Sequence, residues 1–131
     1  MYELSTSSVS KKQLILEIRG NTKISCDLKR HLSPRTVGTI MRSLPLEGNA
    51  HFLGKSILYF ETNVDSGTER ARSEFKKGDV AFLSSSRSIC FFMNDVVSGK
   101  AMTPIGKLGD NIDMLKDVKS GDVLCIYEET A

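Results

Sequence analysis

Tryptophan is absent from this sequence of 131 residues, and histidine occurs only at His31 and His51. Neither histidine has a Cys, Asp or Glu at the spacing of a C-x-x-C or H-x-x-x-H metal site. The sequence also lacks the G-x-S-x-G turn of serine hydrolases and the G-x-x-x-x-G-K-[ST] loop that cradles phosphates. These absences predict no metal, no cofactor and no complete set of catalytic residues.

Long apolar runs are missing as well. No stretch approaches the roughly 18 apolar residues that span a bilayer, and residues 1–10 lack the basic start and apolar stretch of a secretion signal. We therefore expect a soluble cytoplasmic protein without a membrane partner. The cysteines, Cys26, Cys90 and Cys125, are odd in number and too far apart for a disulfide framework or a zinc site. Each lies in an apolar run, which predicts thiols that fill the core.

Charge of one sign is not concentrated anywhere in the chain. Lys and Arg number 18 against 16 Asp and Glu, a formal charge of +2. Binding to nucleic acid requires basic residues gathered on one face, so we expect no nucleic-acid partner. The basic residues of the segment 65–77 are interrupted by Glu69 and Glu74, which predicts a solvated surface loop.

Alternating apolar and polar residues predict a sheet. The segments 14–18 and 24–28 have the period of two of half-buried strands, and Gly20-Asn21 between them favours an antiparallel hairpin. Further β segments are expected from apolar runs at 57–60, 80–83, 89–93, 104–108 and 123–127.

Only two helices are predicted. Ser33 is expected to cap the first, Pro34 fits its first turn, and Pro45 ends it. Asp110 is expected to cap the second, which carries the apolar residues Ile112, Leu115 and Val118. With seven or eight β segments, one sheet closed on itself fits better than βαβ repetition. Residues 1–10 are predicted to form a flexible tail and residues 11–131 a single domain.

The most apolar run, 89–93, holds the strongest indication of a site. On a strand, Ile89, Phe91 and Met93 face one side, while Cys90 and Phe92 face the other. If the first set fills the core, Phe92 is either covered by a helix or loop, or exposed in a groove. The residues alone leave both alternatives open.

Several segments resemble cyclophilins, and more closely a prokaryotic cyclophilin-like family of unknown function. Ser33-Pro34-Arg35-Thr36-Val37 is similar to their first helix start, and 88–93 is similar to their "SQFFI" strand. The prokaryotic family is indicated by 57–62 and by Gly78-Asp79-Val80. The resemblance covers about 13–128 and implies a closed eight-stranded barrel with a ligand groove on its outer wall. It places Phe92 on the aromatic that lines the proline pocket, with Phe91 as its core-facing neighbour.

This sequence departs from cyclophilins at the residues that catalyse prolyl isomerisation. The stretch 56–64 has no arginine where cyclophilins polarise the prolyl amide, Cys90 replaces the glutamine of "SQFFI", and Met102 stands where a pocket histidine is expected. Electrostatic stabilisation of the reaction would therefore be missing, unless Arg42 or Arg87 supplied the charge.

Two functions are compatible with these observations. The first is a binding module that holds a small apolar ligand or an extended peptide in a groove lined by Phe92, Met102, Cys90 and Tyr59. The second is a weak or divergent peptidyl-prolyl isomerase. A homo-oligomer formed through a strand edge or the 65–77 loop remains open as a third role.

Overall fold

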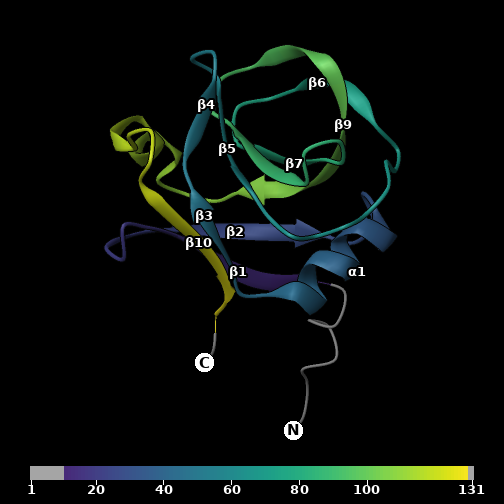
Figure 1. Ribbon diagram of the computed structural model, residues 1–131, viewed down its shortest axis with the longest axis horizontal. Coiled ribbons are helices and arrows are strands. Elements are labelled where there is room, and N and C mark those ends of the chain that lie inside the picture. Colours follow the sequence, from purple (N-terminus) through teal and green to yellow (C-terminus); the bar gives the residue numbers. More distant parts are fainter. Residues whose placement is uncertain (1–10, 130–131) are drawn as a thin grey trace, which may run out of the picture.

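The structure is a computed structural model that describes residues 11–129, so the predicted tail at 1–10 lies outside the described residues. Ten strands in this range form one sheet with the order β3-β10-β1-β2-β9-β7-β8-β5-β4, and β6 pairs with β9 off that path (Figure 1). The strands are β1 (Lys11–Ile18), β2 (Thr22–Lys29), β3 (Leu46–Asn49), β4 (His51–Leu53), β5 (Ile57–Glu61), β6 (Arg72–Phe75), β7 (Asp79–Leu83), β8 (Ser88–Phe92), β9 (Val96–Leu108) and β10 (Val123–Glu128).

The mainly β character is confirmed, whereas the closed eight-stranded barrel is not. The sheet has ten strands, and no ladder among the described residues joins its two ends, β3 and β4. These end strands are consecutive in the chain, with only Ala50 between them. One segment therefore pairs with β10 through its first half and with β5 through its second. The backbone N–H and carbonyl of Ala50 bond to Asp122 and Gly121 instead, which divides this segment into two short strands.

The main core is formed by inward-facing side chains of β1, β2, β5, β7, β8, β9 and β10, together with residues of α1 and of the segment after β9. Leu16 of β1 stands opposite Ile24 of β2 on one side and Ile126 of β10 on the other, and all three are buried. The predicted hairpin is thus confirmed. Its turn places Arg19 and Gly20 at positive φ, where glycine is favoured because it has no Cβ.

Helix α1 (Pro34–Ser43) packs against β2 and β9 and buries Val37 and Ile40 (Figure 1). The predicted side-chain cap is wrong, because the Ser33 hydroxyl donates to the carbonyl of Leu32 rather than to the helix. Glu69 takes this role from a distant segment.

The carboxylate of Glu69 accepts hydrogen bonds from the backbone N–H of Arg35 at 3.2 Å and of Thr36 at 2.9 Å, and from the Thr36 hydroxyl. Desolvation raises the pKa of Glu69, but these hydrogen bonds and the Arg35 charge outweigh it and hold the pKa below its usual value. The unpaired N–H groups of the first helical turn are therefore satisfied by a carboxylate from outside the helix.

The second helix is a 3₁₀ helix, η2 (Ile112–Asp117), which buries its Leu115 side chain in the main core. It follows Asn111 in a left-handed conformation, so Asp110 is not its cap as predicted. Gly78, which contacts η2, has a φ of +93°, a conformation that favours glycine because it has no Cβ, and an added Cβ would also lie 2.9 Å from the end of the Ile112 side chain.

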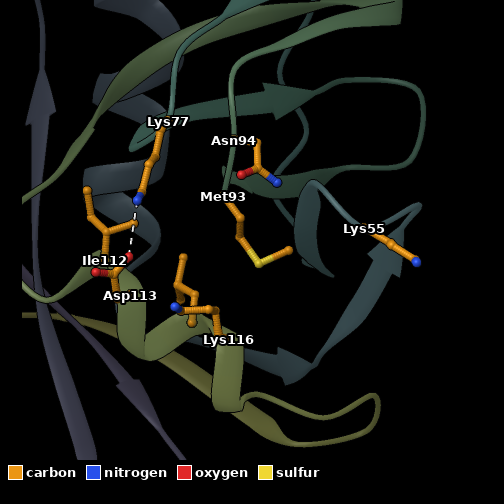
Figure 2. Close-up of a pocket in the computed structure, with 8 residues that line it drawn as sticks. Lys55, Lys77, Met93, Asn94, Ile112, Asp113 and Lys116 are labelled. Atoms are coloured by element: carbon orange, nitrogen blue, oxygen red, sulfur yellow. Dashed lines mark hydrogen bonds and ion pairs between the residues drawn. The ribbon is translucent and has the colours of Figure 1, made fainter.

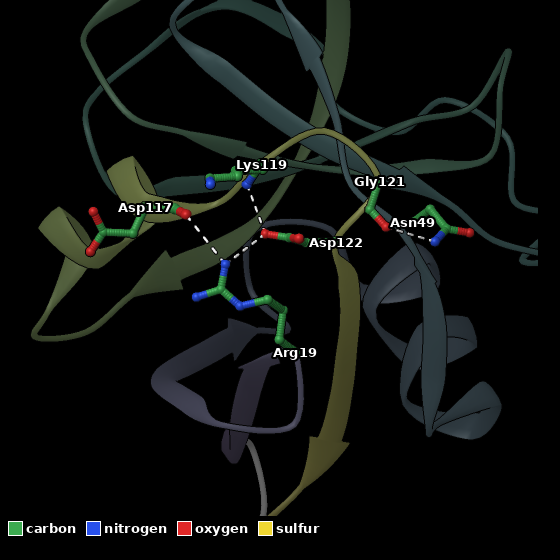
Figure 3. A network of polar contacts seen from close by, with 6 residues as sticks. All are labelled: Arg19, Asn49, Asp117, Lys119, Gly121 and Asp122. Carbon is green, nitrogen blue, oxygen red and sulfur yellow. Dashed lines mark hydrogen bonds and ion pairs between the residues drawn. The ribbon is translucent and has the colours of Figure 1, made fainter.

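A polar network fixes the chain that leads from η2 into β10 (Figure 3). The Arg19 guanidinium donates to the Asp122 carboxylate at 3.0 Å and to the carbonyl of Asp117 at 3.5 Å. Asp122 also accepts from the backbone N–H of Lys119, and Asn49 donates to the carbonyl of Gly121. This network ties the β1–β2 turn, η2 and β3 together.

Two segments predicted as loops contain strands. β6 lies within 65–77, and β9 begins at Val96 rather than at Pro104. The first part of β9 pairs with β6, whereas its second part pairs with β7 and β2. Because β6 pairs with the first part of β9, β6 lies over the outer face of the sheet.

Candidate functional site

Strand β8 presents its two faces as predicted from the sequence. Ile89 and Phe91 belong to the main core, and Met93 packs against it. Cys90 and Phe92 belong to a second, smaller cluster on the opposite face. The buried members of this second cluster are Ile57, Phe75, Ala81, Cys90, Phe92 and Met102, and Tyr59, Leu83 and Val96 pack against them.

Phe92 and Met102 do not line an open groove. Phe92 is 0% exposed and Met102 1%, and the Phe92 ring stacks on Phe75 with their centroids 4.4 Å apart. The cover comes from β6, which carries Phe75, and from β9, which carries Met102. Of the two alternatives for Phe92, burial is therefore the one observed, and strands rather than α1 provide it.

Next to this cluster lies a cavity of about 450 Å³, called here the Tyr59 cavity. Tyr59 and Cys90, two of the four predicted site residues, line it, whereas Phe92 and Met102 lie in the packed cluster behind it. The full lining comprises Leu53, Tyr59, Glu61, Leu83, Ser86, Cys90, Ser98, Gly99 and Lys100.

The walls of the Tyr59 cavity come from different strands next to the second cluster. Tyr59 and Cys90 are paired across β5 and β8, while Ser98, Gly99 and Lys100 come from the first part of β9. Sequence reasoning missed these three residues, because they were assigned to a loop. It also missed Leu53, which is 50% exposed, and Glu61, since no pattern in the sequence brings either to this place.

The chemical groups of the cavity suit noncovalent binding. Burial raises the pKa of the Cys90 thiol to about 12, so this residue is a thiol at neutral pH and a poor nucleophile. The Tyr59 ring stacks on the ring of the exposed His51, with their centroids 5.4 Å apart. This contact holds the Tyr59 ring in place as one aromatic wall of the cavity. Glu61 and Lys100, both exposed, supply one charge of each sign to an otherwise largely apolar lining.

Neither arginine considered as a substitute for the isomerase arginine lines this cavity. Arg87 lies in the turn between β7 and β8, with its guanidinium 3.9 Å from Asp65, and Arg42 donates to Thr39 on α1. Arg72 approaches the second cluster, 5.0 Å from the centre of the Phe75 ring, but its guanidinium pairs with Asp79. No cluster of three metal-binding side chains occurs in residues 11–129.

The sequence profile of the Cyclophilin-like family matches residues 12–127. The chain belongs to this family. A hypothetical protein from Archaeoglobus fulgidus, AF2241, has the same fold, with a TM-score of 0.75 and 23% identity over 92% of this chain and 96% of that one. The structure of McbB in complex with tryptophan is also similar, with a TM-score of 0.70 and 17% identity.

The match to McbB covers 91% of this chain but 45% of McbB, so the chain spans less than half of that protein. Among curated proteins, none matches this sequence. No helix in the described part of this cyclophilin-like chain has the length and apolar character to cross a bilayer.

Proposed function

We propose that this cyclophilin-like chain binds a small, mainly apolar organic molecule in the Tyr59 cavity and is not a prolyl isomerase. One observation carries the proposal: a cavity of about 450 Å³ remains beside a fully packed aromatic cluster. This volume lies within the roughly 300 to 1,000 Å³ of small-molecule sites. Leu53, half exposed at this cavity, is the kind of apolar surface that a ligand would cover.

The lining defines the kind of ligand. Tyr59 and Leu83 offer flat and branched apolar contacts, and Glu61 and Lys100 offer a carboxylate and an ammonium group to polar substituents. The ligand would therefore have an apolar body, such as an aromatic ring, with polar atoms toward these two residues. An extended peptide would place a single side chain in this volume.

Isomerase activity is not expected from this arrangement. The reaction requires a cation or hydrogen-bond donor held against the prolyl amide. Neither Arg42 nor Arg87 lines the cavity, and the exposed ammonium of Lys100, its one cation, has no ion pair within residues 11–129 that would hold it in a catalytic position. The uncatalysed reaction takes tens of seconds or longer, so a protease-coupled peptide assay is sensitive to weak acceleration. Rates equal to those in buffer are the expected result.

Binding is tested with indole as the probe, by titration into the ¹⁵N-labelled protein. Indole is also the side-chain ring of tryptophan, which McbB binds. Shifts are expected at Tyr59, Cys90 and Gly99. A Gly99→Phe variant should abolish them, because Gly99 lines the cavity and a Cβ there meets nothing within 4 Å.

Gly67→Phe is the matched control. Gly67 has equally open space around it but does not line the cavity, so this variant should bind indole as the parent chain does. Equal binding by Gly99→Phe, or shifts confined to other residues, would contradict the proposal.

A further inference from the structure

A second concave surface lies where Met93 and Asn94, at the end of β8, face η2 (Figure 2). It comprises a cavity of about 300 Å³ and an adjoining one of about 440 Å³. Both are lined by Lys55, Met93, Leu115 and Lys116, so they form one continuous surface, called here the lysine cleft.

The lysine cleft is separate from the Tyr59 cavity. Met93 packs against the main core, whereas Cys90 belongs to the second cluster on the other face of the sheet. The two lining sets have no residue in common. A ligand of one site would therefore leave the residues of the other untouched.

Positive charge exceeds negative charge in the lining. Lys55, Lys77 and Lys116 are opposed by one lining carboxylate, Asp113, which pairs with Lys77 at 3.1 Å. Asp95 is close by, and its carboxylate accepts the backbone N–H of Lys77 at 2.8 Å. Lys55 has no ion pair within residues 11–129. Figure 2 shows Lys77, Asp113 and Lys116 on one side of Met93 and Lys55 on the other.

The floor of the lysine cleft is apolar. Leu115 is fully buried, Met93 and Ile112 pack partly against the main core, and Phe52 extends the apolar lining on the side of Lys55. A fully hydrated ion would leave this surface uncovered, and a neutral hydrocarbon would leave the ammonium groups without a partner. A methionine thioether adapts to apolar groups of different shape.

We propose that the lysine cleft binds a small amphipathic anion, with its apolar chain along the partly exposed Met93 and Phe52 and its anionic head group toward Lys55, while Lys116 adds positive charge on the other side of Met93. Lys77 is occupied by Asp113 and makes the smaller contribution. This site is independent of the ligand proposed for the Tyr59 cavity.

Octanoate, 1-octanol and acetate are the probes, because they separate the two features of the site. Octanoate carries both the charge and the chain, and each of the others lacks one. In ¹⁵N-detected titrations at low salt, octanoate should shift the signals of Lys55, Asn94 and Lys116 and bind more tightly than either 1-octanol or acetate. Added salt should weaken octanoate binding, since exposed charges are screened.

Lys55→Gln and Lys116→Gln remove one charge each from the cleft. Each should raise the octanoate dissociation constant about two- to fivefold, the range of an exposed ion pair. Lys23→Gln, which changes an exposed lysine on β2 outside the lining, should leave it unchanged.

Three outcomes would overturn the proposal. Equal affinity for 1-octanol would show that charge has no role, and an equal effect of Lys23→Gln would show general attraction to a basic surface. Octanoate shifts confined to Tyr59, Cys90 and Gly99 would assign octanoate to the other cavity. Because indole is tested separately there, either proposal can fail without the other.

Discussion

Replacing Phe92 tests whether this ring is part of the core or of an open ligand site. The ring is fully buried against Phe75, so Phe92→Ala removes both apolar contacts and an aromatic stack. Truncation of a buried phenylalanine costs about 3–5 kcal/mol. A domain of this size has about 5–15 kcal/mol of stability in total, so this variant should lose a large fraction of its stability and unfold at a clearly lower urea concentration than the parent chain.

Phe92→Leu keeps the fold and allows a quantitative test. It should lower the free energy of unfolding by about 1–2 kcal/mol, of which the lost stacking on Phe75 is about 0.5–1.5 kcal/mol. A double-mutant cycle with Phe75→Leu should give a coupling of that size. Phe91→Leu is the control, because Phe91 belongs to the main core rather than to the cluster of Phe75. Its cycle with Phe75→Leu should be additive within about 0.5 kcal/mol.

Urea unfolding followed by far-ultraviolet circular dichroism measures these free energies, since the chain has no tryptophan to report by fluorescence. An unchanged unfolding midpoint for Phe92→Ala would refute the burial of this ring. A coupling near zero between Phe75 and Phe92 would refute the contact between β6 and the outer face of the sheet.

Two further substitutions test how distant segments are joined. Glu69→Ala should lower stability by about 1 kcal/mol at neutral pH, because it removes the acceptor at the start of α1, whereas the exposed Glu74→Ala should have little effect. Since folding lowers the pKa of Glu69, its contribution to stability is present at pH values above the unfolded-state pKa of about 4.3. This contribution is lost as the pH falls through the folded-state pKa. Plotted against pH, the stabilities of the parent chain and of Glu69→Ala should therefore converge in acid. A constant difference between them would contradict the role of Glu69 at the start of α1. Gly106→Ala should prevent soluble folding, because its Cβ would overlap the carbonyl oxygen of Asp27 on β2. An added Cβ at Gly99 would have nothing within 4 Å, so Gly99→Ala should match the parent chain in expression and thermal melting. A well-folded Gly106→Ala would contradict the close approach of β2 and β9.

The local pattern of the sequence predicted the parts of the fold that depend on neighbouring residues. The period of two in 14–18 and 24–28 determined the first hairpin, and the same period assigned Phe91 and Phe92 to opposite faces of β8. Pro34 marked the start of α1 correctly. These features follow from side-chain alternation and backbone restriction, which act within a few residues.

Long-range pairing decided the rest. β6 consists mostly of polar residues, and no local signal marks it, because strand pairing uses backbone groups that every residue except proline carries in full. Its pairing with β9 buries Phe92 and leaves the Tyr59 cavity beside it. The lysine cleft likewise brings together Lys55, Lys77 and Lys116 from three separate segments. The sequence by itself determined which residues face the same side of a strand, but only the tertiary structure decided which faces are covered, since that depends on contacts between segments far apart in the chain.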